Sequence, residues 1–299
     1  MALEVTPIDR VANIDRDSFQ SRYARQSRPL VIEGLSRFWP AYNKWTLDYF
    51  KSVCGDTVVP LYDGSKADAS KKVNEPAARM KFSEYLDLIA SGPTDLRMFT
   101  FNVVDHLPQV KTDFIKPDLC RFFVDRFPMM FFGGQGSKVF LHYDIDVPHI
   151  FLTQFHGSKR VLLFPPKCTP RLYKLPLSWH AIEDIDWWNP DLEKYPALRG
   201  VKGMTTILKH GETLYMPPGW WHYMEYIEGG FAVALRAVSL PWRIFEGIWN
   251  VTIVRTVDNL LRKHVGRKWF DYKERRAYEK SNQYALRHVL PEADQAPVI

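Results

Sequence analysis

The sequence predicts a mainly β fold with helical embellishment, in which helices precede and follow a β-sandwich or small β-barrel. Two observations support this prediction. From about residue 96 to 240 the chain consists of short runs rich in β-branched and aromatic residues, which glycine and proline separate. Before these runs and after Pro241, apolar residues recur at helical spacing instead. The 299 residues contain no internal repeat, so we expect one domain with embellishments.

The segment 1–95 is expected to be a mixed α/β embellishment that packs on the barrel. It contains three runs with helical spacing and one short apolar run typical of a buried strand. The helices are expected over 15–26, 46–55 and 81–92, and the strand over 28–35. Thr46 and Ser83 are residue types that cap a first helical turn. Gly55 and Gly92 are typical of the residue after a helix end.

The segment 96–240 is expected to form the β core. Its strand candidates are LRMFTFNVV, RFPMMFFGG, KVFLHYDI, HIFLTQFHG, KRVLLFPP, MTTILKHGETLYMPP and FAVALRAVSL. The proline pairs at 165–166 and 217–218 are typical of turns between such strands rather than of linkers. The core therefore continues without a domain boundary to about residue 240.

The segment 241–299 is expected to be helical and to lie outside the barrel. Eight apolar residues recur there at helical spacing: Ile244, Phe245, Ile248, Trp249, Ile253, Val257, Leu260 and Leu261. A stripe that broad must be covered by something. We expect a second copy of the chain to cover it, which predicts a homodimer. Packing of the stripe on the chain's own barrel is the alternative.

The bulk composition is that of a globular protein, with 46% hydrophobic and 25% charged residues. The first residues carry charges throughout and lack the apolar run of a secretory signal. No uncharged apolar stretch is long enough to span a membrane. The three cysteines, Cys54, Cys120 and Cys168, show no CxxC spacing, which favours a reducing compartment. We expect a cytoplasmic protein, with the nucleus as the alternative in a eukaryote.

The net charge of +6 is concentrated in one segment. Between Arg255 and Arg287 there are ten Lys and Arg residues against four acids, which accounts for the whole excess. One interpretation is a solvated helix face. The other is a basic patch for an acidic partner such as RNA.

The stretch LHYDIDVPHIFLTQFHGSKRVLLFPP places polar residues on an apolar strand. His142 and Asp144 are two apart, so they point to the same face of a strand. An imidazole and a carboxylate directed into a barrel lumen are costly unless a ligand such as a metal satisfies them. His222 lies on another strand candidate. Two histidines and one carboxylate form the facial triad of non-haem Fe(II) oxygenases, which leaves three positions of an octahedral ion for a co-substrate and O₂.

Three segments, in the same order along the chain, resemble the JmjC and cupin-like family of Fe(II)- and 2-oxoglutarate-dependent oxygenases, and within it the asparaginyl hydroxylase of hypoxia-inducible factor. They are HYD…QFHGSKRVLLFPP from residue 142, DWWNPDLEKYPAL over 186–198 and GETLYMPPGWWHYMEYIEGG over 211–230. The resemblance is strongest over 130–240 and looser over 28–50. It implies a double-stranded β-helix, or jelly-roll, core that holds Fe(II) on His142, Asp144 and His222.

The resemblance also implies that Lys159 binds the distal carboxylate of 2-oxoglutarate. A buried dianion needs a cation, and lysine is a compact one. The chain departs from the family at two positions. Val139 stands where a threonine often contacts the same carboxylate. Arg236 stands where the family has a small polar residue, so its guanidinium either binds a carboxylate of co-substrate or substrate, or pairs with a structural acid.

A further departure is a longer segment after Asp144, which brings Asp146 and His149 near the site. Asp146 shares the strand face of Asp144 if the strand stays regular, and Pro148 makes a break there the alternative. His149 is expected to contact substrate or a metal ligand rather than the metal. The strand Met98–Asn102 is expected to supply another contact to the co-substrate, without a residue that the sequence singles out.

The expected enzyme is an Fe(II)/2-oxoglutarate-dependent dioxygenase that hydroxylates a protein or peptide side chain, with succinate and CO₂ as co-products. The first alternative is a JmjC-type hydroxylase of RNA such as tRNA, favoured by the basic segment 255–287. The second is a cupin-fold metal-binding protein without oxygenase activity. Small-molecule substrates form a third group. No zinc-finger pattern accompanies the barrel, so a chromatin demethylase is not favoured.

Overall fold

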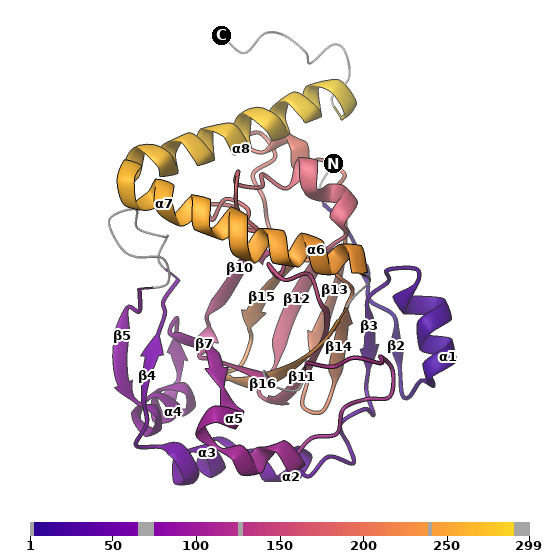
Figure 1. The fold of residues 1–299 in the computed structure, drawn as a ribbon, viewed down its shortest axis with the longest axis vertical. Coiled ribbons are helices and arrows are strands. Elements are labelled where there is room, and N and C mark those ends of the chain that lie inside the picture. The colour runs from indigo at the N-terminus through magenta and orange to yellow at the C-terminus, as the bar shows by residue number, and fades with distance from the viewer. Residues whose placement is uncertain (1–2, 65–74, 125–127, 239–240, 290–299) are drawn as a thin grey trace.

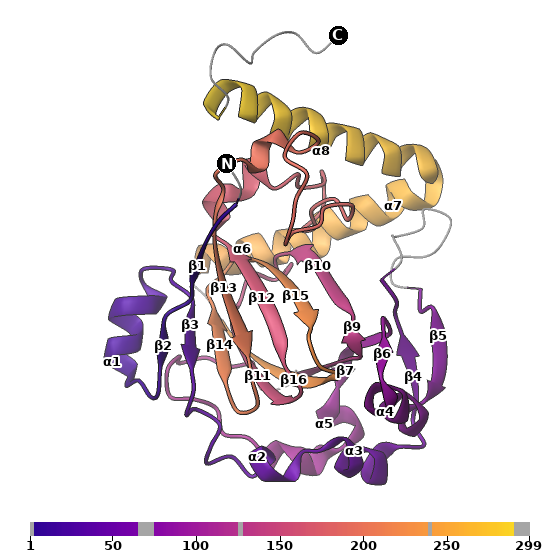
Figure 2. The same cartoon turned by 180° about the vertical axis from the view of Figure 1, so that it is seen from behind.

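The structure is a computed structural model that describes residues 3–64, 75–124, 128–238 and 241–289 (Figures 1 and 2). Its strands are β1 (Glu4–Pro7), β2 (Arg10–Val11), β3 (Leu30–Ile32), β4 (Val58–Leu61), β5 (Ala78–Lys81), β6 (Pro93–Thr94), β7 (Arg97–Asn102), β8 (Met129–Gly133), β9 (Gln135–Gly136), β10 (Lys138–His142), β11 (His149–His156), β12 (Lys159–Phe164), β13 (Lys202–Leu208), β14 (Thr213–Met216), β15 (Trp221–Tyr226) and β16 (Gly230–Ala237).

Its α-helices are α1 (Arg16–Phe19), α2 (Ala41–Lys44), α3 (Leu47–Cys54), α4 (Phe82–Ser91), α5 (Val103–His106), α6 (Pro241–Trp249), α7 (Arg255–Val265) and α8 (Arg267–His288). Two segments are π-helical, η1 (Gln20–Ala24) and η5 (Asn250–Val254). Three are 3₁₀-helical, η2 (Pro108–Thr112), η3 (Pro166–Arg171) and η4 (Pro196–Leu198).

Two sheets form the core. One has five strands in the order β1-β13-β12-β15-β10, and the other has seven in the order β2-β3-β14-β11-β16-β8-β7. Within each sheet the central neighbours are antiparallel, and the chain passes repeatedly from one sheet to the other. This is the predicted mainly β jelly roll with helical embellishment. The two sheets face each other in Figure 1, and residues of both line one cavity, which is the lumen.

The N-terminal segment is part of both sheets as well as a cover. Strand β1 pairs with β13, and β3 pairs with β14, so the first strands extend one edge of each sheet. The helices α2 to α4 lie below the barrel in Figure 1. Phe50 of α3 packs edge-on against Phe132 and Phe231 of the seven-stranded sheet, with ring centroids 5.7 and 5.2 Å apart. The helices therefore bury the outer face of that sheet.

The helix ends test two of the expected caps. Thr46 caps α3 as predicted, since its hydroxyl accepts a hydrogen bond from the amide of Tyr49 at 3.0 Å. The prediction for Ser83 is wrong, because α4 begins at Phe82, two residues earlier than a cap at Ser83 requires, and Lys81 is its N-cap. The amide of Ser83 donates to the carbonyl of Gly55 instead, at 2.9 Å. The local cap of α4 comes from Glu84, whose carboxylate accepts a hydrogen bond from the amide of Lys81 at 3.2 Å.

The C-terminal helices lie along one end of the barrel. Figure 1 shows α6, η5 and α7 as one long helical course, with α8 folded back above it. Two of the small residues on α8, Ala277 and Ala285, are buried in a cluster with Tyr173 and Trp187 against the outer face of the five-stranded sheet. No helix in the described part of the chain is long and apolar enough to cross a membrane.

Candidate metal centre and co-substrate cavity

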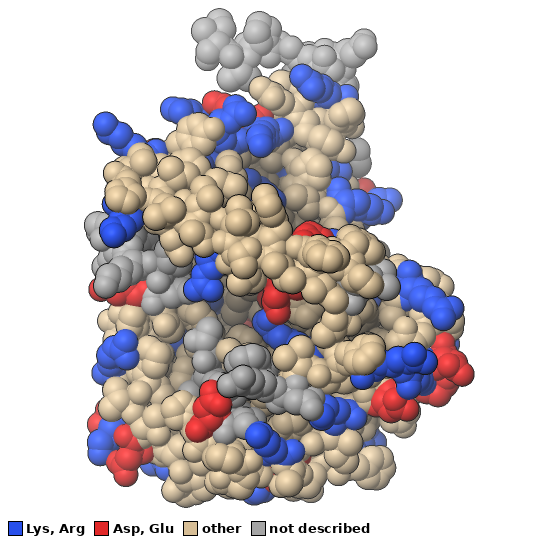
Figure 3. Space-filling model, in the orientation of Figure 1, with Lys and Arg blue, Asp and Glu red and all other residues tan. Residues whose placement is uncertain are grey.

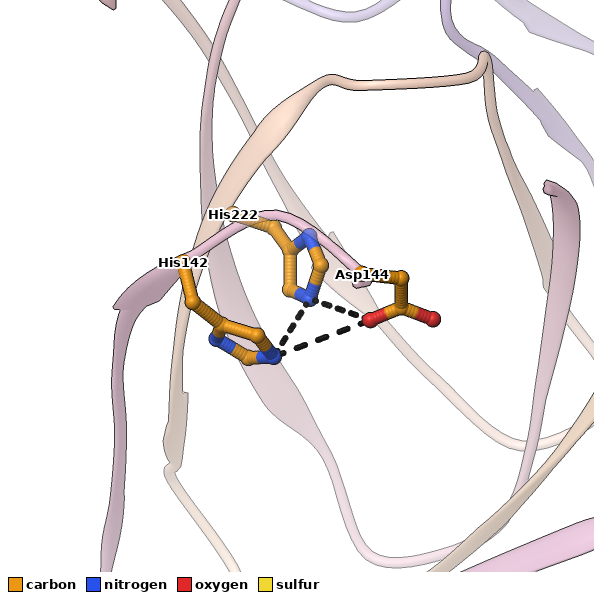
Figure 4. Close-up of side chains that lie close together, drawn as sticks. All are labelled: His142, Asp144 and His222. Atoms are coloured by element: carbon orange, nitrogen blue, oxygen red, sulfur yellow. Dashed lines mark hydrogen bonds and ion pairs between the residues drawn. The ribbon is translucent and has the colours of Figure 1, made fainter. Parts of the chain in front are cut away.

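Two histidines face each other across neighbouring strands. His142 ends β10, His222 lies on β15, and the antiparallel register places them directly opposite each other. Their Nε2 atoms are 3.1 Å apart. The nearer carboxylate oxygen of Asp144, Oδ1, lies 3.7 Å from Nε2 of His142 and 3.6 Å from Nε2 of His222. Figure 4 shows the three side chains pointing at one common position.

The hydrogen bonds of the two rings determine which nitrogen carries the proton. Nδ1 of His142 lies 2.8 Å from the carbonyl oxygen of Phe140, and Nδ1 of His222 lies 3.2 Å from that of Trp220. A carbonyl only accepts, so each Nδ1 must donate and each neutral ring presents an Nε2 lone pair. Two lone pairs and a carboxylate oxygen thus converge without a proton between them. A shared cation satisfies all three.

The electrostatics of the site favour the same states. Burial lowers the pKa of His142 well below its ordinary value, and the facing His222 lowers it further. Burial also lowers the pKa of His222. For Asp144, burial raises the pKa, but the positive charge of Arg236 outweighs this effect and the pKa is lowered, so the carboxyl is held ionised. Neutral imidazoles and a carboxylate are the ligand forms that a divalent metal needs.

The separations also fit a metal. Facial ligands at the usual ~2.1 Å from an octahedral ion lie roughly 3 Å apart, close to the observed 3.1–3.7 Å. The triad borders a cavity of about 420 Å³. Ile150, Leu152, Met216 and Met224 form an apolar part of its wall. The cavity is therefore large enough for a small co-substrate beside the metal.

Lys159 lies in this cavity and is only 2% exposed. Its Nζ stands 4.2 Å from the ring centroid of Tyr226. Among the described residues it has no carboxylate within ion-pair distance, and burial lowers its pKa to about 7. The next residue, Arg160, points to the opposite face, where it pairs with Glu225 at 2.7 Å. Lys159 is thus a buried cation without a counterion from the described chain.

Arg97, at the start of β7, is a second cation in the cavity that sequence reasoning missed. Its guanidinium lies between the rings of Phe99 and Phe140, 5.8 and 5.5 Å from their centroids, and donates to the carbonyl of Lys138. Its Nε is buried and has no hydrogen-bond partner among the described residues. Met98 and Phe99, from the stretch Met98–Asn102 where a co-substrate contact was expected, line the same cavity, and that contact stays a prediction. An arginine at a strand start is usually solvated, so the sequence carried no signal.

Arg236 pairs with acids in the structure. One terminal nitrogen, Nη2, donates to Oδ2 of Asp144 at 2.6 Å, and the other, Nη1, donates to Oδ1 of Asp146 at 2.7 Å. This is the second of the two alternatives that the sequence left open. A contact between Arg236 and the co-substrate stays a prediction. Asp146 lies beside the site, as expected.

His149 does not lie at the site, so that expectation is wrong. Its Nδ1 is 2.9 Å from the hydroxyl of Tyr215, and it faces the aromatic residues outside the lumen. The next residue, Ile150, lines the cavity instead. The reason is register, because β11 begins at His149 and alternation then directs Ile150 inward. Val139 lines the cavity, as its place before His142 predicts.

The C-terminal helices also reach the cavity. Arg262 of α7 and Phe270 of α8 are among its lining residues. Arg262 donates through Nε to Asp258 at 2.7 Å, and the ammonium of Lys273, which is fully buried, donates to the same carboxylate at 2.7 Å. Two of the ten basic residues therefore neutralise a buried acid. The remaining basic residues of 255–287 are exposed or partly exposed.

Comparison with known proteins places these features in a family. The profile described as Cupin-like domain matches residues 16–237. JmjC domain-containing protein D of Dictyostelium discoideum is 27% identical over 73% of this chain and 53% of its own length. Lysine-specific demethylase JMJ30 of Arabidopsis thaliana is 28% identical over 76% of this chain and 54% of its own length. The chain spans about half the length of these two relatives.

A third relative is similar over most of both chains. The human tRNA wybutosine-synthesizing protein 5 is 27% identical over 82% of this chain and 82% of its own length. The relatives thus include proteins named for action on lysine and on tRNA. JmjC proteins of this kind use Fe(II), 2-oxoglutarate and O₂, and the chain carries the matching triad of His142, Asp144 and His222.

Proposed function

The chain belongs to the cupin-like domain family, and on that premise we propose that it is an Fe(II)- and 2-oxoglutarate-dependent dioxygenase that hydroxylates a protein or peptide side chain. The observation that carries the proposal is the convergence of two Nε2 lone pairs and one carboxylate oxygen, 3.1–3.7 Å apart, at the wall of a cavity. The metal ligands in this proposal are His142, Asp144 and His222.

The co-substrate site is proposed from two cations that line the cavity, Lys159 and Arg97. 2-Oxoglutarate is a dianion, and Lys159 is a buried cation whose charge the described residues do not compensate. Arg97 adds a guanidinium on the same cavity, and no described residue accepts a hydrogen bond from its Nε. We assign the distal carboxylate to Lys159, with Arg97 as a further contact. Val139 leaves that carboxylate without the hydroxyl contact that the family often has.

Each part of the chain then has a defined task. Bound Fe(II) with 2-oxoglutarate and O₂ supplies the oxidising chemistry. The triad holds the ion, Lys159 orients the co-substrate, and the apolar wall of Ile150, Leu152 and Met224 excludes water. The carbonyls of Phe140 and Trp220 keep the protons of the two histidines on Nδ1, away from the metal.

Succinate release tests the proposal. Purified protein with Fe(II), ascorbate and 2-oxoglutarate is offered peptide, tRNA and small-molecule pools, and succinate and substrate mass are measured. A peptide that gains one oxygen with matching succinate supports side-chain hydroxylation. Turnover with tRNA alone moves the substrate to RNA. A protein that binds metal but releases no succinate above the His142→Ala background supports the second alternative, a metal-binding cupin fold without oxygenase activity.

Action on RNA is the second candidate, because the similarity to the tRNA wybutosine-synthesizing protein covers most of both chains. Lys263, Arg267 and Lys268 are exposed near the α7–α8 turn. Changing all three to Gln should lower RNA affinity and flatten its salt dependence, because fewer counterions are released. Arg262 is left in place, since it pairs with buried Asp258.

The control for this test is a triple variant on another surface. Arg22, Arg25 and Arg37 are also exposed, so changing them to Gln removes the same charge far along the chain. RNA binding that falls equally in both triple variants reflects net charge alone. RNA binding unchanged in the α7–α8 variant contradicts the RNA candidate.

We also propose that the chain is a homodimer through its C-terminal helices. Of the predicted stripe, Phe245, Ile248, Trp249 and Leu260 are 72, 54, 59 and 51% exposed, so the chain's own barrel does not cover them. Figure 3 shows a broad face with few charges along this helical course. An apolar face of this kind on a soluble chain marks an interface. Light scattering of the parent and of Ile248→Arg with Leu260→Arg tests it, and a monomeric parent at micromolar concentration contradicts it.

A further inference from the structure

The metal-ligand carboxylate sits in a strained turn. The amide of Val147 donates to the carbonyl of Asp144 at 3.0 Å, which closes a turn just after β10. Val147 has a φ of 51°, in the left-handed region that β-branched residues avoid, and it is fully buried. Such a conformation persists only where the surroundings hold it, and it is often found at functional sites. The contacts that hold this turn therefore bear on the metal centre.

Arg236 holds the turn from the seven-stranded sheet. Its Nη2 donates a hydrogen bond to Oδ2 of Asp144 at 2.6 Å. Its Nη1 donates to both carboxylate oxygens of Asp146, at 2.7 and 2.8 Å. The two oxygens of Asp144 thus have different partners. Oδ1 faces the two histidines, and Oδ2 faces the guanidinium. The hydrogen bonds from Arg236 to the two carboxylates are charge-assisted. The planar guanidinium, whose two terminal nitrogens form a fork, gives them a fixed direction.

The C-terminal helices hold the same turn from the other side. The side-chain amide of Asn250, at the start of η5, donates to the carbonyl of Ile145 at 3.1 Å. Gly247 of α6 lies against Asp146 so closely that a Cβ there would stand 2.5 Å from the Asp146 carbonyl oxygen. The turn is thus fixed between a sheet and a helix. Little freedom remains for Asp144 to turn by backbone motion.

We propose that Arg236 is a positioning residue that restricts Asp144 to one metal-binding oxygen. Coordination through both oxygens would require Oδ2 to leave its charge-assisted bond to Nη2. By holding Oδ2, Arg236 keeps the coordination position that a second Asp144 oxygen would fill available to the co-substrate. The inference rests on the proposed metal site, and it explains why the chain has an arginine where the family has a small polar residue.

The test uses Co(II) in place of iron, without co-substrate, because Co(II) absorption in the visible range reports the number and kind of ligands. Arg236→Gln should change the Co(II) spectrum of the metal-loaded protein, because Asp144 gains a second oxygen on the ion. Co(II) should bind at least as tightly, since a positive charge beside it is removed. 2-Oxoglutarate should then bind the Co(II) form at least tenfold more weakly, by calorimetry.

Three further variants test whether the effect on the Co(II) spectrum comes from the geometry of the Arg236 guanidinium, from its charge or from a change in folding. Arg236→Lys keeps the charge but cannot hold both acids, so it should resemble Arg236→Gln in its spectrum. Asp146→Asn weakens the interaction of Arg236 with the acid on its other terminal nitrogen. It should shift the spectrum in the same direction as Arg236→Gln, to a smaller extent. Arg160→Gln removes a matched strand arginine that pairs with Glu225 outside the lumen, and should leave the spectrum unchanged.

The outcomes are distinct. An unchanged Co(II) spectrum in Arg236→Gln with weaker 2-oxoglutarate binding would assign Arg236 to the co-substrate and overturn the inference. A parent-like Arg236→Lys would show that charge alone matters and would also overturn it. If Arg236→Gln does not fold, Arg236→Lys and Asp146→Asn decide by the same spectrum. A parent protein that binds no Co(II) would contradict the proposed metal site itself.

Discussion

Two carboxylates in this molecule, one buried and one partly buried, have opposite surroundings. Asp258, between α7 and α8, receives hydrogen bonds from Arg262, Lys273 and the indole of Trp269, each at 2.7–2.8 Å. Asp144, in the lumen, receives one guanidinium nitrogen on one oxygen and faces two imidazole lone pairs with the other. The first carboxylate has two cations for one acid. Asp144 instead shares one cation, Arg236, with a second acid, Asp146.

The difference separates a structural cluster from a ligand site. Every oxygen of Asp258 has a donor, so the cluster needs nothing more and joins the two C-terminal helices. At Asp144 the acceptors outnumber the donors, and this imbalance persists in a buried place only if something positive binds there. Counting donors against acceptors around a buried acid therefore indicates which acids hold a fold together and which hold a ligand.

The largest expected effect is on the ligand site. His142→Ala, Asp144→Ala and His222→Ala should each abolish succinate production, because each removes one of three protein ligands. Folding should be retained, since Arg236 keeps Asp146 as a partner when Asp144 is lost. Succinate assays with circular dichroism check both parts. Near-normal turnover in any one of the three would contradict the triad.

The structural cluster should show the reverse pattern. Asp258→Ala leaves the fully buried Lys273 without its acid, which should lower the free energy of unfolding by about 3–5 kcal/mol. Asp271→Ala breaks the exposed pair with Arg267 and should cost about 0–1 kcal/mol. Urea unfolding followed by fluorescence compares the two. Equal losses would mean that the Asp258 cluster contributes no more than a surface ion pair.

A smaller effect on activity is expected when Lys159, the buried cation of the cavity, is replaced. Lys159→Ala should raise the 2-oxoglutarate requirement by roughly tenfold to over a hundredfold, because a charge-assisted bond of ~1.5–3 kcal/mol is lost. Metal affinity should change little. Titration of 2-oxoglutarate at saturating iron measures the co-substrate requirement, and calorimetry with Mn(II) measures the metal affinity. An unchanged half-saturation would move the distal carboxylate to Arg97 or Arg236.

The pH dependence of 2-oxoglutarate affinity is a further test of the role of Lys159. Burial lowers the pKa of Lys159 to about 7, so without ligand the side chain loses its proton above that pH. An anion bound beside it raises the pKa again, so binding above pH 7 takes up a proton. 2-Oxoglutarate affinity should therefore fall as pH rises above about 7, by up to roughly tenfold per unit. Calorimetry in buffers of different ionisation enthalpy measures the uptake, and a Lys159→Met variant without this slope is the control.

The same pKa has a consequence for the ligand-free fold. Between about pH 7 and the ordinary lysine value of 10.5, the unfolded chain binds a proton at Lys159 that the folded chain does not. Stability therefore gains a contribution that rises with pH in this window, and the cost of burying the charged form is fully present below it. Urea unfolding of parent and Lys159→Met across this range checks the sign.

Local patterns predicted a large part of this protein. Strand alternation and turn residues predicted the β core, and Thr46 predicted the start of α3. His142 and Asp144 converge as predicted, although β10 ends at His142 and Asp144 lies in the turn after it rather than on the strand, and the antiparallel partner brought His222 opposite. These succeed because periodicity, caps and turns are properties of neighbouring residues. The failed cap at Ser83 shows the limit, since a contact to Gly55 decided it.

From the sequence alone, the mainly β fold class and the grouping of His142, Asp144 and His222 were predicted, and the family resemblance rather than a local pattern implied that Lys159 faces the lumen. Only the tertiary structure decided which acids Arg236 meets, because Asp144 lies 92 positions away along the chain. The same holds for Arg97, whose burial depends on rings from β7 and β10, and for His149, whose face depends on where β11 begins. The physical reason is that charges and rings interact through space. Their partners are set by how the sheets close, which no local pattern contains.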